Sequence, residues 1–416
     1  MTAASARPRP PARLVRWGLS YGAAVVAANV LNALFQVTVA RLLDPGDYSL
    51  LVTLFAAILV LGVAALAVQA SVARGVAGRL ADGDAAGAGA ALRDGMISVL
   101  RLCLVLGAAG ALLAVPLVYL LDVQHPLPLV GTALAVGFGL ELAVVWGGLQ
   151  GAHRFGPLSL GQLGFVSLKL ALGILLAALG AGVAGIMFAV AAATGLTLVV
   201  FSWPLRGLLA AARLRPSDRR RVLGGYSGGV AVSLGIFMAL TSIDLFVARA
   251  SFTPRTAGAY AAASVAARAL LLVPAAVTTV LFPHVSTLAD RVRERRHLLG
   301  GLFATAALGG LATLLFAAFP RLLLDLTFGH AYSQASHWLA PFAFAMTLYS
   351  LANVYLFHFL AIGRVRYAFV AAPVLLAQAP LYALFHARPL QLIAIQIGCA
   401  GALLALSELY DRRISH

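Results

Sequence analysis

The chain has 416 residues, of which 62% are hydrophobic and only 11% are charged, so it has too little polar surface for a soluble protein. Its net charge of +16 does not indicate nucleic-acid binding, because the arginines are spread between apolar runs instead of forming one basic domain. The apolar runs also lack the apolar and polar alternation of a membrane β-barrel, so the sequence predicts an all-α integral membrane protein.

Apolar runs long enough to cross a bilayer recur along the whole chain. A helix needs about 20 apolar residues to span the hydrocarbon core, because each backbone polar group there must be satisfied within its own segment. The sequence therefore predicts about twelve transmembrane helices, at 17–40, 48–72, 95–121, 128–149, 157–180, 182–205, 223–248, 256–282, 298–319, 337–361, 366–386 and 389–409.

Arginines in the connections predict how these helices are oriented, since positive residues are retained in the cytoplasm. Most of the 30 Lys and Arg residues fall in the two terminal segments and in alternate connections. We therefore expect both termini to be cytoplasmic. The composition, with many Ala, Gly and Arg but a single Lys, suggests a GC-rich bacterial gene, so the expected location is the cytoplasmic membrane of a bacterium. The connections on the opposite, outer side carry only Arg41, Arg249, Arg255, Arg321 and Arg388.

The longest basic connection, 206–222, divides the chain into two halves of six spans each. We expect an N-terminal lobe at 1–205, a cytoplasmic linker at 206–222 and a C-terminal lobe at 223–416. A weak internal repeat supports this division, since Val39-Ala40-Arg41 in the first half corresponds to Val247-Ala248-Arg249 in the second. Because each half has an even number of spans, the two lobes have the same orientation. A central cavity between two such lobes suits alternating access.

The repeat and the segments beside it resemble the multidrug/oligosaccharidyl-lipid/polysaccharide (MOP) exporter superfamily, and particularly its O-antigen (Wzx-type) flippases. The resemblance spans most of the chain. It implies a V-shaped bundle, like that of MATE proteins, which moves a polyprenyl-pyrophosphate-linked oligosaccharide across the cytoplasmic membrane. The segments that carry it are Asn29-Val-Leu-Asn32, Phe35-Gln36, Val39–Tyr48, Ser242–Arg249, Ala257–Tyr260 and Leu281–Pro283.

Three cations lie inside predicted spans, where an ionisable group is costly and usually marks a partner or a wet cavity. Lys169 and Arg268 lie in the middle of their spans, one in each lobe, and Arg101 lies in the third span. One interpretation is that they bind the substrate pyrophosphate. The other is structural: Arg101 reaches the inner interface, Lys169 pairs with Glu141, and Arg268 pairs with Asp244. Asn32 and Gln36, one helical turn apart, either face bound sugar or hydrogen-bond between helices.

Two acids inside the spans are candidates for coupling transport to an ion. Asp244 and Glu141 could bind Na⁺ or exchange a proton, and Asp244 could equally form a structural pair with Arg249 or Arg268. His358 is expected to contribute to packing. We expect no cofactor and no metal site.

The sequence contains no GxxxxGKS phosphate loop, HExxH, GxSxG or Rossmann fingerprint, so it does not predict an enzyme. The main prediction is a flippase for a lipid-linked oligosaccharide, with polysaccharide polymerases or glycosyltransferases as possible partners and no nucleic acid. The alternatives are a cation-coupled drug exporter of the MATE type, which should have an acidic cavity, and a membrane glycosyltransferase or ligase, which needs catalytic groups at the outer face.

Overall fold

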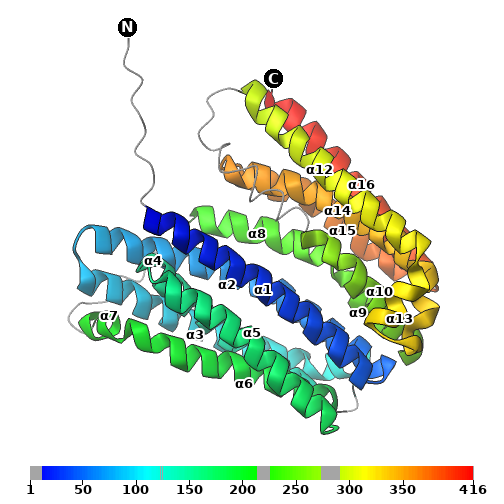
Figure 1. Cartoon of the computed structure of the whole chain (residues 1–416), viewed down its shortest axis with the longest axis horizontal. Helices are drawn as coiled ribbons and strands as arrows, with labels where there is room; N and C mark the ends of the chain where they lie inside the picture. Colours follow the sequence, from blue (N-terminus) through cyan, green and yellow to red (C-terminus); the bar gives the residue numbers. More distant parts are fainter. Residues whose placement is uncertain (1–11, 122, 124, 213–224, 273–290, 416) are drawn as a thin grey trace.

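The structure is a computed structural model, and it describes residues 12–121, 123, 125–212, 225–272 and 291–415. All of the regular structure in these ranges is helical. Figure 1 shows two groups of helices, which lie close together around α9, α10 and α13 and diverge toward the N-terminus and C-terminus of the chain. The all-α membrane architecture predicted from the sequence is confirmed.

The N-terminal group contains a helix at each of the first six predicted spans. The first four of these helices are longer than the predicted apolar runs, because their ends continue into more polar sequence. A 3-10 turn, η1 (Trp203–Leu205), leads into the short helix α7 (Arg206–Ala211) at the start of the predicted linker, whose residues 213–222 lie outside the described ranges. The six long helices are α1 (Ala12–Leu42), α2 (Pro45–Ala81), α3 (Ala85–Leu120), α4 (Leu127–Gly151), α5 (Phe155–Ala178) and α6 (Gly182–Ser202).

The C-terminal group is less regular than the sequence predicts. The seventh predicted span is interrupted between α8 (Gly225–Leu240) and α9 (Ile243–Ser251), and the eighth is described only as far as Leu272. The connection near residue 330, which the sequence predicts to lie on the outer side, is also helical. The remaining elements are α10 (Pro254–Arg268), η4 (Ala269–Leu272), α12 (Arg291–Ala318), α13 (Pro320–Thr327), η6 (His330–Ala335), α14 (Ser336–Ala361), η7 (Val365–Tyr367), α15 (Ala368–Leu384) and α16 (Pro389–Ser415).

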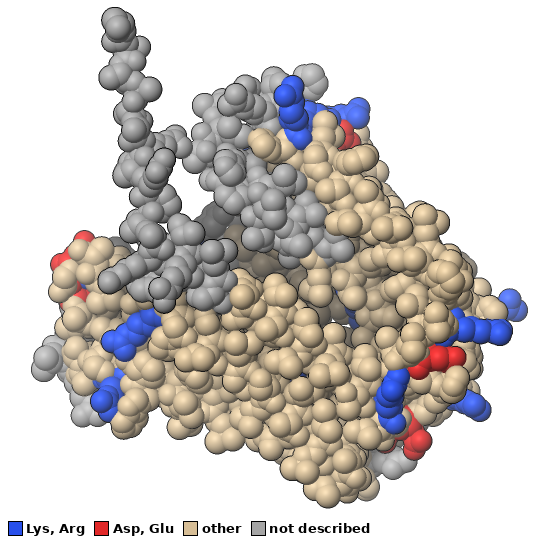
Figure 2. Space-filling model, in the orientation of Figure 1, with Lys and Arg blue, Asp and Glu red and all other residues tan. Residues whose placement is uncertain are grey.

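The outside of the bundle is suited to lipid. Nine of the described helical segments are long and apolar enough to cross a membrane. The shorter apolar helix Ala368–Leu384 lies at the predicted span 366–386. Large apolar side chains such as Leu112, Phe303 and Phe369 are more than three-quarters exposed, which would be unfavourable in water. In Figure 2 the charged side chains lie mostly toward the ends of the molecule, and the broad middle is uncharged. The chain is therefore a multi-pass membrane protein.

The two groups of helices share one apolar core where they meet. Phe35, Leu51 and Tyr48 of the N-terminal lobe belong to the same buried cluster as Tyr260 and Phe342 of the C-terminal lobe. A second cluster, around Val144 and Leu149, lies wholly within the N-terminal lobe. Away from the shared core, Figure 2 shows the surface hollowed between the lobes.

Glycine allows α10 to approach the start of α2 very closely. A Cβ atom at Gly258 would lie 2.1 Å from the carbonyl oxygen of Pro45, and one at Gly46 would lie 2.8 Å from Cβ of Pro254. Both contacts join opposite lobes at the end of the molecule predicted to be outside. Any side chain at Gly258 would have to push the lobes apart.

We expect Gly258→Ala to lower the free energy of unfolding by about 1–3 kcal/mol, the usual effect of overpacking, although alanine favours helix over glycine. Gly398→Ala in α16 is the matched control, because no atom lies within 4 Å of its Cβ position. The midpoint of thermal unfolding in detergent should fall for Gly258→Ala and stay level or rise for Gly398→Ala. Equal midpoints for the two variants would show that the lobes do not pack this closely.

Candidate functional site

Lys169 lies inside the N-terminal lobe, among aromatic rings. It comes from the middle of α5, and its side chain is only 7% exposed. The ammonium Nζ donates a hydrogen bond to Oδ1 of Asn32 on α1. It also lies 4.8 Å from the centre of the Phe35 ring and 5.7 Å from that of Phe55, and Phe165 completes the enclosure at 6.0 Å. Ring faces attract a desolvated cation, so these contacts partly offset the loss of water.

The charge of Lys169 has no carboxylate partner in the part of the chain that the structure describes. The expected pair with Glu141 does not form, and Glu141 lies half-buried on α4 without an ion pair to any described residue. One helical turn beyond Asn32, the side-chain oxygen of Gln36 is buried without a described hydrogen-bond partner. The region around Lys169 therefore combines a positive charge without a described carboxylate and one buried oxygen without a described hydrogen-bond donor.

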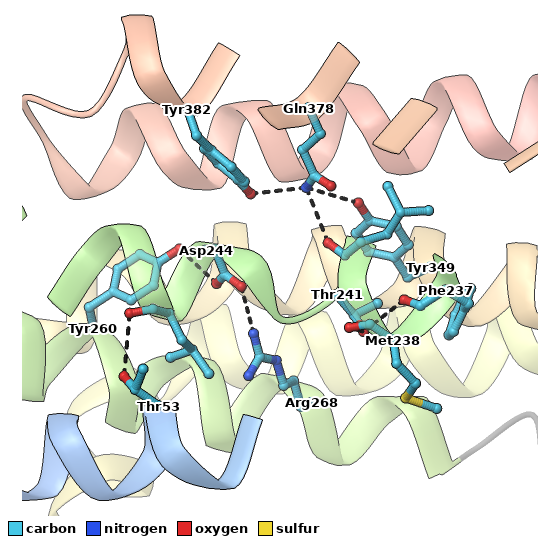
Figure 3. A network of polar contacts seen from close by, with 12 residues as sticks. Thr53, Phe237, Met238, Thr241, Asp244, Tyr260, Arg268, Tyr349, Gln378 and Tyr382 are labelled. Carbon is cyan, nitrogen blue, oxygen red and sulfur yellow. Dashed lines mark hydrogen bonds and ion pairs between the residues drawn. The ribbon is translucent and has the colours of Figure 1, made fainter. Parts of the chain in front are cut away.

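Asp244 and Arg268 form a buried ion pair inside the C-terminal lobe, as the structural interpretation of the sequence expected. Nη2 of Arg268 lies 2.7 Å from Oδ1 of Asp244, and the Tyr260 hydroxyl donates to Oδ2 at 2.9 Å. Asp244 is fully buried, and Figure 3 shows the guanidinium and the phenol approaching its two oxygens from either side. Both carboxylate oxygens are thus engaged, and the charge is neutralised within the protein.

A break in the seventh span places Asp244 at a helix start. Helix α8 ends at Leu240, and α9 begins at Ile243. The Gln378 amide on α15 donates to the carbonyl of Leu240 at 3.1 Å and to the Tyr382 hydroxyl at 3.0 Å, and Figure 3 shows it between α8 and Tyr382. Unwound backbone at membrane depth is stable only where protein groups satisfy it, and Gln378 does this for the last carbonyl of α8.

Gln378 is a site residue that the sequence analysis did not identify. The adjacent Thr241-Ser242 pair inside an apolar span is a weak signal of the break, because both side chains compete for backbone hydrogen bonds. Nothing in the sequence links that pair to Gln378, which lies 138 residues from the carbonyl it satisfies.

Helix α2 contacts both charged regions. Its Thr53 hydroxyl bonds to the carbonyl of Leu245 in the opposite lobe at 3.4 Å, and Leu245 directly follows Asp244. Two residues further along α2, Phe55 contacts Lys169. Helix α2 thus lies between the surroundings of Lys169 and the α9 segment that carries Asp244, because residues two positions apart on a helix point to nearly opposite sides.

The other predicted site residues lie apart from this interface. Arg101 is exposed on α3, as expected of an arginine that reaches the inner interface. His358 is buried against Phe359, with ring centres 5.5 Å apart, as expected of a packing residue. The Leu281–Pro283 segment quoted for the resemblance lies outside the described residues.

The fold is similar to those of several solved membrane transporters. No protein-family model and no curated protein sequence matches the chain. A structure of the lipid II flippase MurJ in an inward closed conformation has a TM-score of 0.70 at 13% identity, over 94% of this chain and 87% of that one. The eukaryotic MATE transporter AtDTX14 has a TM-score of 0.65 at 13% identity, over 95% of each chain. An inward-facing MATE transporter of the MOP superfamily has a TM-score of 0.62 at 15% identity, over 93% of this chain and 94% of that one. The chain therefore shares its all-helical membrane fold with MATE transporters and with MurJ.

Proposed function

We propose that this protein is a flippase that moves a polyprenyl-pyrophosphate-linked oligosaccharide across the cytoplasmic membrane of a bacterium by alternating access between its two lobes. The observation that carries this proposal is Lys169, a buried cation for which the described residues supply no carboxylate. A desolvated, uncompensated charge lowers stability. A function that uses the positive charge, such as binding an anionic substrate, explains why it is there.

The neighbourhood of Lys169 suits a pyrophosphate. The amine now donates to the neutral amide of Asn32, and a phosphate oxygen is a stronger acceptor for a charged donor. The long aliphatic stem lets the amine turn from Asn32 toward a ligand between the lobes. The Asn32 and Gln36 amides are then available for the hydroxyls of the sugar. Arg268 has a second role in this scheme if the substrate competes with Asp244 for its guanidinium.

Coupling of transport to an ion involves the two intramembrane acids in this proposal. Asp244 becomes available to Na⁺ or a proton only when Arg268 leaves it, whereas Glu141 has no described ion pair in the present conformation. The arginine distribution supports cytoplasmic termini. A lipid-linked substrate also implies that glycosyltransferases make it on the inner side and that a polymerase or ligase uses it outside.

A cation-coupled drug exporter is the second candidate, because two of the three similar structures reported above are MATE transporters. A site for cationic drugs should be acidic. Here, however, the buried Asp244 is neutralised by Arg268, whereas the buried Lys169 has no described carboxylate partner. The electrostatics therefore favour an anionic substrate.

Purified protein in proteoliposomes tests the two candidates directly. Fluorescent polyprenyl-pyrophosphate oligosaccharides should become accessible to a membrane-impermeant quencher or glycosidase faster than in protein-free vesicles. A polyprenyl-linked neutral sugar lacking the pyrophosphate is the matched control and should not be flipped. Uptake of a cationic dye against a Na⁺ or proton gradient, with no flipping of any pyrophosphate lipid, would support the exporter.

A further inference from the structure

The two arginines of the internal repeat each reach across to the opposite lobe. Arg41 lies in the last turn of α1, and Arg249 lies in the last turn of α9. Both occupy the outer end of the first span of their lobe, in the repeated Val-Ala-Arg sequence. Neither has a place in the proposed substrate site, so their contacts require another explanation.

Arg41 caps the end of a helix in the C-terminal lobe. Its Nε donates to the carbonyl of Thr327 at 2.9 Å, and its Nη2 donates to the carbonyls of Leu326 and, at 3.4 Å, Asp325. These are the last three residues of α13. Carbonyls at a helix C-terminus have no partners within the helix and carry partial negative charge, so a guanidinium is a favourable ligand for them.

Arg249 makes the corresponding contact in the other direction. Its Nε donates to the carbonyl of Leu121, directly beyond the end of α3, at 2.9 Å, and its Nη1 donates to the carbonyl of Gly46 at 3.1 Å. Arg249 is 9% exposed, whereas Arg41 is exposed to solvent. The two contacts therefore differ in strength, because hydrogen bonds to a buried charge are less screened than those at a surface.

The pairing follows the repeat. Helix α3 is the third span of the N-terminal lobe, and α13 directly follows α12, the third predicted span of the C-terminal lobe. Each lobe thus presents an arginine from its first span to the segment that directly follows the third span of the other lobe, which is Leu121 in one direction and α13 in the other. A repeated hydrophobic sequence does not by itself require that each arginine contacts the opposite lobe. The reciprocal contacts therefore indicate that both arginines act when the lobes approach each other at this end.

Aromatic packing surrounds the two arginines. The Tyr332 hydroxyl in η6 donates to the carbonyl of Ala40 at 2.9 Å, beside Arg41. The Tyr332 ring centre also lies 5.6 Å from that of Tyr48 on α2, and both rings are buried. Because Gly46 lies against Pro254 and Gly258 lies against Pro45 across the lobes, this end of the molecule is tightly closed.

We propose that Arg41 and Arg249 form a reciprocal latch that keeps the outer ends of the lobes closed and releases when the protein opens outward. This inference rests on the alternating access of the proposed function. The hydrogen-bond acceptors described above are main-chain carbonyls at or beside helix ends, and the Asp47 carboxyl at the start of α2 adds an electrostatic attraction to Arg249. The latch therefore responds to the position of these helix ends. On opening, the carbonyls of α3 and α13 and both guanidiniums pass to water, so the latch is reversible.

The distance between the outer ends of the lobes tests the latch without any substrate. Spin labels at Leu179→Cys and Leu384→Cys, in a protein whose natural cysteines are replaced (Cys103→Ala, Cys399→Ala), mark exposed positions beyond α5 and at the end of α15. Neither position contacts the latch. Pulsed electron resonance in lipid nanodiscs then gives the populations of closed and open outer ends.

We expect Arg249→Ala to raise the ratio of open to closed protein about tenfold or more, the effect of losing hydrogen bonds to a buried charge. Arg249→Lys should give much of this shift, since one ammonium cannot reproduce the fork that spans two carbonyls. Arg41→Ala should give a smaller shift because it is exposed, and the double variant should give the largest. Arg255→Ala, an exposed outer arginine for which the described residues show no contact with the other lobe, should match the native protein.

Native-like distances in folded Arg41→Ala and Arg249→Lys proteins would overturn the latch. If Arg249→Ala does not fold, the other two variants still decide. A shifted distance distribution in a protein that flips no lipid would leave the latch standing and reject the proposed substrate. If the arginine variants keep the native distances and the protein does flip lipid, the latch is rejected and the proposed function stands.

Discussion

Replacing Lys169 with Met is expected to reduce flipping of a pyrophosphate-linked oligosaccharide by about 10-fold to 100-fold, the effect of losing hydrogen bonds from a charged group. The fold should survive, because Met fills a similar volume and removes a charge that is desolvated among three Phe rings. Loss of transport without loss of stability is the result expected of a substrate-binding cation. The measurement is the initial flipping rate in proteoliposomes, beside the midpoint of thermal unfolding.

Two matched variants separate charge from shape at this position. Lys169→Arg keeps the charge and should keep part of the activity. Asn32→Asp leaves Lys169 in place and keeps an acceptor where the Asn32 oxygen now lies, but it neutralises the charge locally. We expect Asn32→Asp to lower flipping about as much as Lys169→Met does, while raising stability. Native flipping by Lys169→Met would show that this lysine is structural and would remove the main support for the proposed substrate.

Lys169 is also the only lysine in the chain, so amine chemistry reports on it separately from every other side chain. A small amine reagent should modify it slowly in the present conformation, where it is 7% exposed. If the lobes open toward this residue during transport, modification should accelerate in the Arg249→Ala protein or in active vesicles, and a pyrophosphate lipid should protect it. Peptide mass spectrometry distinguishes Lys169 from the N-terminal amine.

Removing one partner of the Asp244–Arg268 pair should have the largest effect on stability. Asp244→Ala leaves the guanidinium of Arg268 buried without its carboxylate, and the loss of one member of a buried pair costs about 3–5 kcal/mol. Tyr260 also loses its acceptor. We expect the thermal unfolding midpoint to fall sharply and the yield of folded protein in the membrane to decrease.

The double variant Asp244→Asn/Arg268→Gln provides the control, because both charges disappear together and the amides can hydrogen-bond each other and Tyr260. The single variant Asp244→Asn, like Asp244→Ala, leaves Arg268 without its carboxylate, and the double variant should recover most of the stability that this single variant loses. Flipping by the double variant then separates the two interpretations of Asp244. Unchanged dependence on a Na⁺ or proton gradient would assign the pair a structural role only, whereas loss of the dependence in a stable protein would assign Asp244 to coupling.

The sequence by itself determined that this protein lies in a lipid bilayer, and it determined the positions of the long helices. Runs of about 20 apolar residues permit little else in a bilayer, so each of the twelve predicted spans coincides with described helical structure. Sequence also identified Lys169, Arg268 and Asp244 as exceptional, because charges inside apolar runs are visible without any contact. It left two interpretations open for each, since the energy of a buried charge depends on its partners.

Only the tertiary structure decided those partners. Asp244 meets Arg268 and Tyr260, residues 24 and 16 positions away, and Lys169 meets Asn32 at a separation of 137. The break in the seventh span is stabilised by Gln378 from another helix, and the repeat arginines bind helix ends up to 286 positions away. In an apolar chain of this kind many helix pairings bury similar areas, so hydropathy cannot choose among them. The choice depends on close backbone approaches such as that at Gly258 and on hydrogen bonds across the lobes, and both exist only once the helices are packed.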